Sequence, residues 1–416
     1  MLSSRLPKDL SPSPFFAELE RAKAESAPFI DMTVSSPVKA GLPVDLNAAV
    51  EEARKDFGCW NPDAAGWKSA REAVVEYYRE RGGNFTAGQI ILTASTSEAY
   101  SVLFKTFCDP GDVILTPMPG YPLLDTLAQL EHLECAPYFL QLRRENARKL
   151  ATDERREGAA FRFVLDSDSL LAAPEKAKIL LLVSPHNPTG HCVSREEWNV
   201  AVRFCEENDM ILVVDEVFGD YAFSDKVSRT WQYVFSESSL WDAGGNDLIN
   251  LPENGPKCPI FWLNGLSKAV GSPQLKLGWM AFYAPREKFE EIRAALEFVE
   301  DAYLSVSAPA QALGTSLLPK AAAYEAQVKE RLLANWQTLR EAFPAKYCPE
   351  VLGGWYAVVR LGEDDEELTL RLLREKRVLV QPGFFFDFDE DGWVVISLLQ
   401  EPATFKEAVQ RMKELQ

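Results

Sequence analysis

Short runs of apolar residues alternate with segments of helical periodicity between about residues 90 and 283. Most of these runs are almost continuously apolar, which is typical of parallel strands that helices cover on both faces. The segments 97–107 and 195–207 have helical spacing, and Ser194 precedes the second one as a capping residue. The alternation predicts an α/β domain with a mainly parallel, seven-stranded sheet covered by helices. The predicted strands are Ile90–Thr93, Val113–Thr116, Cys135–Leu140, Ile179–Val183, Ile211–Asp215, Ile260–Asn264 and Gly278–Tyr283.

The pattern changes after residue 283, where a smaller α+β unit is predicted. Its expected helices are 286–303, 322–343, 366–376 and 403–415, and its expected strands are 355–361, 378–381 and 393–398. Two stretches look like surface insertions: 143–158 is rich in charge, and 224–259 is rich in Gly, Pro and Asn. Trp231, Tyr233 and Trp241 in the second stretch indicate that it packs on the rest of the protein.

Composition excludes several classes of function. The chain has 416 residues, enough for two or three domains, and its formal net charge is −18. This acidity argues against a nucleic-acid partner, because affinity for phosphate backbones comes mainly from clustered Lys and Arg. No run approaches the length of a membrane span or has the form of a signal peptide. The seven cysteines are dispersed and the three histidines are poorly spaced for zinc, so we expect a cytoplasmic protein without a bound metal.

Polar and aromatic residues follow the predicted strands, where ligands of α/β proteins bind. The turn at 93–99, TASTSEA, includes Ser95, Thr96 and Ser97, and its hydroxyls and helix N-terminal amides are suited to a phosphate. The Pro/Gly turn at 117–122 presents Tyr121 at the same edge. Each feature alone also fits ordinary helix capping or an ordinary turn.

Three later strands end in further candidates. SPHNPTG at 184–190 fixes the amide of Asn187 in a tight turn. Asp215 ends an apolar strand, where its carboxylate needs a cationic partner to stay ionised. Ser267 and Lys268 follow the next strand, and Lys276 lies eight residues further on. A single lysine is most often a surface charge, so Lys268 gains its meaning from the other groups.

The order of these motifs resembles the class I and II aminotransferases of pyridoxal 5′-phosphate (PLP) fold type I, over roughly residues 28–400. The resemblance implies that Lys268 carries PLP as a Schiff base and also moves protons. It further implies that Asp215 pairs with the pyridine nitrogen, Asn187 bonds the ring oxygen O3′ and Tyr121 stacks on the ring. The residues that match the phosphate contacts are Thr96, Ser97, Ser267 and Lys276, and Ser95 of the same turn is counted with them as cofactor-binding.

The same resemblance implies the architecture and the partners. It divides the chain into an N-terminal arm at 1–45 that joins the small domain, a large PLP-binding domain at 46–295 and a small domain at 296–416. DMTVSSP at 31–37 is similar to the strand and turn that close over the substrate. WNPDAAG at 60–66 is similar to a segment that reaches the partner's site, which implies a homodimer with shared active sites. Its substrates would be a small-molecule amino donor and an oxo acceptor.

The sequence departs from the family at five positions. Lys276 replaces an arginine, so a point charge replaces a bidentate fork. Phe218 and Trp60 replace tyrosines, and Gly265 replaces a serine. Val395 stands where the family has the arginine that holds the substrate carboxylate. Either another residue holds the carboxylate, or the substrate presents a different group there.

Two alternatives to transamination stay open at this stage. A PLP-dependent lyase that eliminates at a carbon–sulfur bond would use the same fold and motifs. A non-catalytic PLP-binding module is less favoured, because it needs an attached DNA-binding domain and only 27 residues precede the resemblance. The presence of Lys268, Asp215 and Asn187 also argues against that module.

Overall fold

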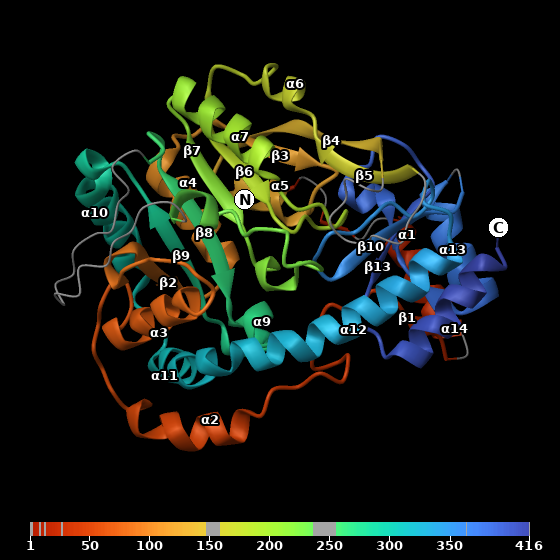
Figure 1. Cartoon of the computed structure of the whole chain (residues 1–416), viewed down its shortest axis with the longest axis horizontal. Helices are drawn as coiled ribbons and strands as arrows, with labels where there is room; N and C mark the ends of the chain where they lie inside the picture. Colours follow the sequence, from red (N-terminus) through yellow and green to blue (C-terminus); the bar gives the residue numbers. More distant parts are fainter. Residues whose placement is uncertain are drawn as a thin grey trace.

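The fold was obtained as a computed structural model of the chain. It describes residues 3–7, 10–11, 14–25, 28–146, 159–235, 255–362 and 364–415. An eight-stranded sheet forms the larger part of the molecule and is flanked by helices (Figure 1). Its strands are β2 (Ile90–Thr93), β3 (Val113–Met118), β4 (Glu134–Asn146), β5 (Ala159–Leu165), β6 (Ala177–Val183), β7 (Ile211–Asp215), β8 (Ile260–Gly265) and β9 (Gly278–Tyr283).

The spatial order of the strands is β2-β9-β8-β7-β6-β3-β4-β5. The five central strands from β8 to β4 run parallel, whereas β9 is antiparallel to both β2 and β8, and β5 is antiparallel to β4. Strand β2 therefore runs in the same direction as the parallel strands. The carboxyl ends of β2, β8, β7, β6 and β3 consequently meet at one edge of the sheet.

Both faces of this sheet are buried. Along β7, Ile211 and Val213 belong to one core cluster, whereas Leu212 and Val214 belong to the other. This alternation follows from the two-residue period of a strand, and it explains why the strand sequences are apolar throughout. The helices of this part are α3 (Lys68–Arg79), α4 (Thr96–Phe107), α5 (Leu123–Leu130), α6 (Ser167–Leu170), α7 (Arg195–Glu207), α8 (Gln232–Phe235), α9 (Leu266–Ala269) and α10 (Arg286–Tyr303).

The mainly parallel α/β fold agrees with the sequence prediction, but the sheet has eight strands instead of seven. The additional strand is β5, which pairs with an extension of β4 as far as Asn146. The charged residues of the expected insertion at 143–158 hid the extension of β4, because they interrupt the apolar pattern on which strand prediction rests. Strand β5 begins just beyond that stretch and is largely apolar, but it was not predicted. Residues 147–158 lie outside the described part of the chain.

The second expected insertion, 224–259, packs on the protein where it is described. Trp231 is fully buried, with its ring centroid 5.6 Å from that of Tyr78 and 6.5 Å from that of Phe85. The ring of Tyr233 lies against Arg195, whose guanidinium carbon is 4.1 Å from the ring centroid. Trp241 belongs to residues 236–254, which are not described.

The C-terminal part forms two smaller sheets. β10 (Tyr356–Arg360), β13 (Trp393–Ser397) and β12 (Gln381–Pro382) form an antiparallel sheet, and β1 (Ile30–Asp31) pairs with β11 (Val378–Leu379) in parallel. The single strand expected at 378–381 is thus two short strands in different sheets. The helices here are α1 (Pro14–Glu25), α13 (Asp365–Lys376) and α14 (Pro402–Lys413). Figure 1 shows α1 beside α13, so a segment near the N-terminus packs on the C-terminal part of the chain.

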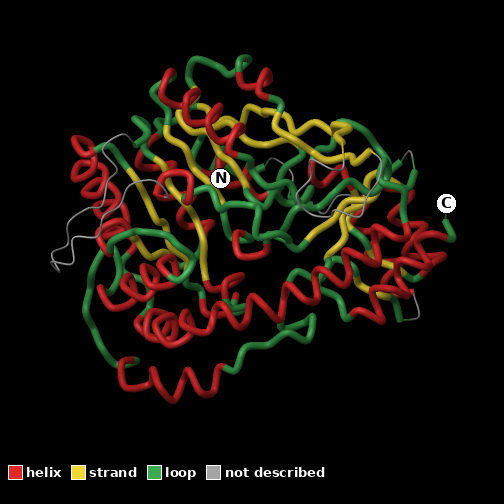
Figure 2. The backbone as a smooth tube through the Cα atoms, in the orientation of Figure 1, coloured by secondary structure: helices red, strands yellow, loops and turns green. Residues whose placement is uncertain are grey.

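Three more helices link these parts. α2 (Leu46–Ala53) and α11 (Ala308–Leu317) pack on each other, and α11 also packs on α3. α12 (Ala321–Ala342) is the long helix that crosses from α9 to α14 along one side of the molecule (Figure 2). Among the residues described here, no helix combines the length and the apolar character needed to cross a membrane.

Candidate active site

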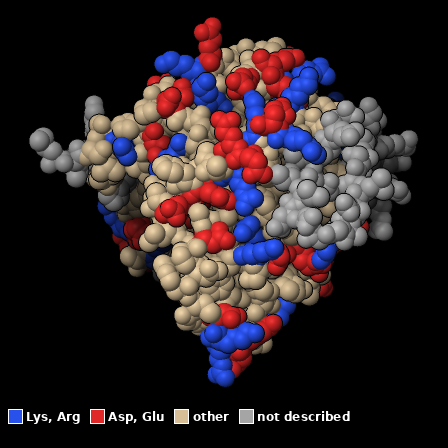
Figure 3. Space-filling model, turned by 90° about the vertical axis from the view of Figure 1, so that its left-hand side faces the viewer, with Lys and Arg blue, Asp and Glu red and all other residues tan. Residues whose placement is uncertain are grey.

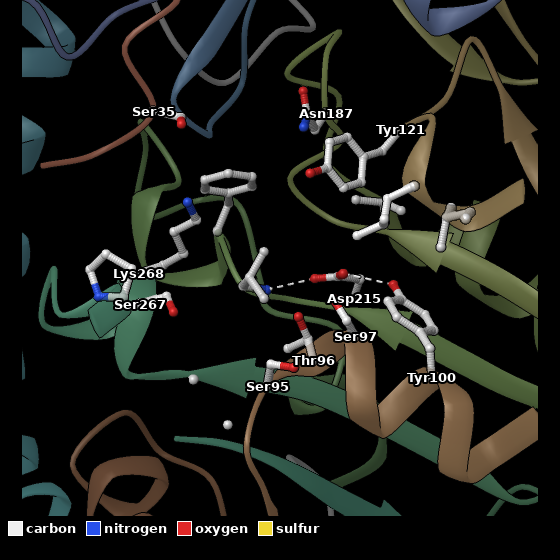
Figure 4. A pocket seen from close by; sticks show the side chains of 18 of the residues that line it. Ser35, Ser95, Thr96, Ser97, Tyr100, Tyr121, Asn187, Asp215, Ser267 and Lys268 are labelled. Atoms are coloured by element: carbon white, nitrogen blue, oxygen red, sulfur yellow. Dashed lines mark hydrogen bonds between the residues drawn. The ribbon is translucent and has the colours of Figure 1, made fainter. Parts of the chain in front are cut away.

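The candidate residues meet at the edge of the large sheet where the carboxyl ends of the strands converge. A cavity of about 360 Å³ opens there between the large sheet and the β10-β13-β12 sheet. Eight of the nine residues predicted from the sequence line it: Ser95, Thr96, Ser97, Tyr121, Asn187, Asp215, Ser267 and Lys268 (Figure 4). The ninth, Lys276, has an exposed side chain and is not among the described residues that line the cavity, although Leu277 and Gly278 are.

The first turn of α4 forms one end of the cavity. Ser95 is the N-cap, and its hydroxyl accepts a hydrogen bond from the amide of Glu98 at 3.2 Å. The carboxylate of Glu98 accepts in turn from the amide of Ala94. The amides of Thr96 and Ser97 have no partner within the helix, because they belong to its first turn. Together with the hydroxyls and the helix dipole they favour an anion at this point.

Asp215 lies at the end of β7 and is held by two hydrogen bonds. The hydroxyl of Tyr100 donates to one carboxylate oxygen at 2.7 Å, and the amide of Val217 donates to the other at 3.0 Å. Burial raises the pKa of Asp215, while these two bonds and the charge of Lys268 act in the opposite direction. A cation placed against this carboxylate would keep it ionised.

Sequence reasoning missed Tyr100, although it also lines the cavity. In the sequence, an aromatic residue one turn into an amphipathic helix is typical of a core position. Its hydroxyl has a function only because α4 lies beside the end of β7, and nothing in the local pattern signals that contact.

The amine of Lys268 lies among aromatic rings. Its Nζ is 4.6 Å from the ring centroid of Trp355 and 5.3 Å from that of Phe218. Burial lowers the pKa of Lys268 to about 8, although the charge of Asp215 acts to raise it. At pH 7 roughly a tenth of the amine is therefore neutral and nucleophilic, far more than for a lysine with the ordinary pKa.

Tyr221 fixes the backbone at this lysine. Its buried hydroxyl donates to the carbonyl oxygen of Lys268 at 2.6 Å. Tyr221 lies shortly after Phe218 in the chain, and its hydroxyl is already bonded to the backbone of Lys268. We therefore assign it a positioning role, distinct from the ring contact that the family's tyrosine would make.

Two glycines explain how closely the backbone approaches the cavity. Gly265 of β8 pairs with Gly278 of β9, and a Cβ atom at Gly265 would lie 3.0 Å from the Cα atom of Gly278. A Cβ atom at Gly278 would lie 3.1 Å from the carbonyl carbon of Ser95. A serine in place of Gly265 would crowd this crossing, which gives a local packing reason for that departure from the family.

The polar, charged and aromatic side chains that line the cavity fit the groups of PLP. The buried end of the Asn187 side-chain amide has no hydrogen-bond partner among the described residues. Because the oxygen and nitrogen of an amide exchange places by a half-turn, Asn187 can present its NH2 group to a ligand oxygen there. The α4 N-terminus suits the phosphate, Asp215 suits a protonated ring nitrogen, and the amine of Lys268 suits the aldehyde. The ring of Tyr121 lies across the cavity from the side of α9, where an aromatic ligand would stack (Figure 4).

Comparisons with known proteins give a consistent result. The family model described as aminotransferase class I and II matches residues 40–412. The chain is 23% identical to a glutamate-pyruvate aminotransferase of Haemophilus influenzae, over 96% of this chain and 93% of that protein. It is 26% identical to an alanine aminotransferase of Mycobacterium bovis, over 84% of this chain and 76% of that protein.

Solved structures show the same fold. An alanine aminotransferase from Pyrococcus furiosus superposes with a TM-score of 0.79 at 20% identity, over 100% of this chain and 99% of that one. A double mutant of the aspartate aminotransferase of Thermus thermophilus superposes with a TM-score of 0.78 at 21% identity, over 100% of both chains. At these identities the likeness concerns the fold alone.

Proposed function

The chain belongs to the class I and II aminotransferases, whose cofactor is PLP, and on this premise we propose how its own residues carry out amino transfer. Lys268 holds the cofactor covalently, and an amino group passes from an amino donor to an oxo acceptor. The observation that carries this proposal is the convergence of Lys268, Asp215, Asn187 and the first turn of α4 on one cavity.

When bound, PLP supplies an aldehyde that accepts an amino group and a ring that withdraws electrons from the neighbouring carbon. Lys268 has two roles in the proposal. Its neutral amine is the nucleophile toward the aldehyde, and it later accepts and returns a proton at Nζ. A pKa lowered to about 8 suits both roles, because the amine can lose and regain its proton near neutral pH.

Asp215 supports this chemistry by its charge. Its carboxylate, held by Tyr100 and Val217, would pair with the protonated ring nitrogen and keep the ring cationic. Asn187 would donate to the ring oxygen. The hydroxyls of Ser95, Thr96, Ser97 and Ser267 would hold the phosphate, and Lys276 would reach it from the turn before β9.

We also propose a homodimer with shared active sites. Trp60 and Phe298 are each 79% exposed, and Tyr303 and Leu304 are exposed as well. The segments that carry Trp60 and Leu304 are joined by hydrogen bonds between Ser305 and the backbone of Asp63, at 3.1 and 3.0 Å. The side of the molecule that carries α10 combines mixed charges with a broad uncharged area (Figure 3). The exposed apolar side chains of Trp60, Phe298, Tyr303 and Leu304 are suited to contact with a second copy of the chain.

The domain division expected from the sequence stays a proposal, with an arm at 1–45, a large domain at 46–295 and a small domain at 296–416. The pairing of β1 with β11 supports an arm that joins the small domain. The seven cysteines are all free thiols, which is consistent with the cytoplasmic location that we propose.

The test is an absorption spectrum of the purified protein before and after amino donors are added. We expect a visible band of lysine-bound PLP in the parent and in Lys178→Ala, an exposed control lysine on β6, but not in Lys268→Ala. A donor should convert the band to that of pyridoxamine phosphate. No band in the parent, or an unchanged band in Lys268→Ala, would contradict the proposal. Release of ammonia and pyruvate would show elimination instead.

A further inference from the structure

One face of the β10-β13-β12 sheet forms the wall of the cavity opposite Asp215. In this antiparallel sheet Tyr356 lies opposite Ser397, and Val395 lies opposite both Val358 and Gln381. Residues directly opposite each other, and residues two apart on one strand, share a face. Tyr356, Val395 and Gln381 therefore lie on the same face, and Tyr356 and Gln381 line the cavity.

Val395 itself offers no polar group to a substrate. Its side chain is fully buried in the main hydrophobic core, between its neighbours on β10 and β12. Gln381 lies directly opposite it on β12, and the side-chain amide of Gln381 is half-buried and makes no hydrogen bond with the described residues. The position that would hold a carboxylate-binding arginine is thus a valine beside an unpaired neutral amide.

The charged side chains around the cavity also disfavour a substrate carboxylate. Among the described residues that line it, Lys268 carries the only cationic side chain and Asp215 the only anionic one. Lys268 is committed to the cofactor, and the cofactor adds a phosphate. Since Asp215 faces the ring nitrogen in the proposed function, no cationic side chain among the described lining residues is left to offset the loss of water of a substrate carboxylate.

An amide side chain also distinguishes ligands by their hydrogen-bonding groups. Glutamine has two N–H donors and one carbonyl acceptor, whereas a carboxylate can only accept. A carboxylate facing Gln381 leaves the carbonyl without a donor. A carboxamide can accept from Gln381 and donate to it at the same time, and a hydroxyl group can do so to a lesser extent.

We propose that the site takes a primary amine whose neighbouring polar group is uncharged, with a carboxamide as the best match, and that Gln381 recognises this group. The proposal rests on the amino-transfer function above and names its substrate class. Tyr356 is the second neutral polar side chain on the same wall.

Binding of inert analogues to the holoenzyme tests the recognition without any reaction. Isovaleramide and isovalerate have the same carbon skeleton and differ in charge, so calorimetric titration with each compares the two groups directly. We expect the amide to bind at least roughly tenfold more tightly than the acid. Gln381→Leu should abolish this preference, and Gln381→Arg should reverse it in favour of the acid. Gln337→Leu, an exposed site on α12 outside the cavity, should leave both affinities unchanged.

Adding leucinamide or leucine to the holoenzyme and following the absorption band of the cofactor separates this inference from the proposed function. Conversion of the cofactor band by leucinamide, with leucine much slower, supports both. Conversion by leucine alone keeps amino transfer and overturns the substrate class. Amide-selective binding without conversion by either donor supports recognition by Gln381 and overturns amino transfer. Equal or tighter binding of isovalerate by the parent, or an unchanged preference in Gln381→Leu, overturns the inference.

Discussion

The hydroxyl of Tyr100 donates a hydrogen bond to the carboxylate of Asp215 at 2.7 Å, across 115 residues of sequence. Tyr100 lies one turn beyond Ser95, Thr96 and Ser97 on the same helix, α4. One helix therefore positions both the phosphate end of the cavity and the carboxylate proposed for the ring nitrogen. Because these two points are fixed to one rigid element, the distance between them is set by the fold and not by flexible loops.

Tyr100→Phe should weaken catalysis through Asp215. A hydrogen bond to a charged group contributes about 1.5–3 kcal/mol, so we expect kcat/KM to fall roughly ten- to hundredfold. The bond lowers the pKa of Asp215, and its loss lets that pKa rise further. The acidic limb of the pH–rate profile should accordingly move to higher pH. The measurement is kcat/KM across the pH range.

Tyr138→Phe is the matched control for this variant. Tyr138 is also buried, and its hydroxyl donates to the carbonyl of Leu181 at 2.8 Å, but it does not line the cavity. Its replacement should lower the stability and leave the pH–rate profile in place. A profile of Tyr100→Phe with an unmoved acidic limb would show that the tyrosine does not act through Asp215.

The pKa of Lys268 predicts how the apoenzyme takes up PLP. Only the neutral amine attacks the aldehyde, so the uptake rate should rise with pH through the pKa of this group. Burial lowers that pKa from 10.5 to about 8, and the midpoint of the rise should therefore lie near 8. Stopped-flow absorbance at a series of pH values measures it. A midpoint near the ordinary lysine value would rule out the buried environment described here.

Asp215→Asn should move the same midpoint downward. The charge of Asp215 raises the pKa of Lys268, so its removal makes the neutral amine prevail at lower pH. Asp225→Asn, an exposed site beyond the cavity, should leave the midpoint unchanged. An unmoved or higher midpoint in Asp215→Asn would mean that the two groups do not interact.

Lys276 is the one predicted phosphate contact that does not line the cavity among the described residues. Its side chain is exposed and its backbone has a φ of 52°, but the next two residues line the cavity. If Lys276 turns toward the phosphate as the sequence predicts, Lys276→Ala should weaken PLP binding roughly tenfold in equilibrium dialysis, by the loss of one charged contact. An affinity equal to that of Lys178→Ala would show that the predicted contact is wrong.

The proposed dimer can be tested with two residues of equal exposure. Trp60 and Leu171 are both 79% exposed, but Leu171 lies at the end of α6, away from the segment joined to Ser305. Trp60→Glu places a charge in the proposed interface and should shift the light-scattering mass toward the monomer. Leu171→Glu should keep the mass of the parent. A monomeric parent protein would contradict the dimer itself.

The sequence by itself determined the α/β class, the bounds of most strands and the places of the candidate residues at strand ends. These features are local: an apolar run such as 211–215 predicts a buried strand, and parallel strands bring their carboxyl ends to one edge. That rule predicts Asn187, Asp215 and Lys268 at one edge of the sheet, where the structure has them around one cavity. The charged stretch after Leu142 broke the local pattern and hid the end of β4. The eighth strand, β5, was not predicted, although its own sequence is largely apolar.

Only the tertiary structure decided which side chains act on these residues. Tyr100 meets Asp215, Trp355 covers the amine of Lys268, and Gln381 lies opposite Val395 because separate helices and sheets pack together. Each of these residues looks like an ordinary core or surface position in its own segment. Packing between distant elements sets the contacts and the burial that shift the pKa values, and short-range periodicity carries no information about it.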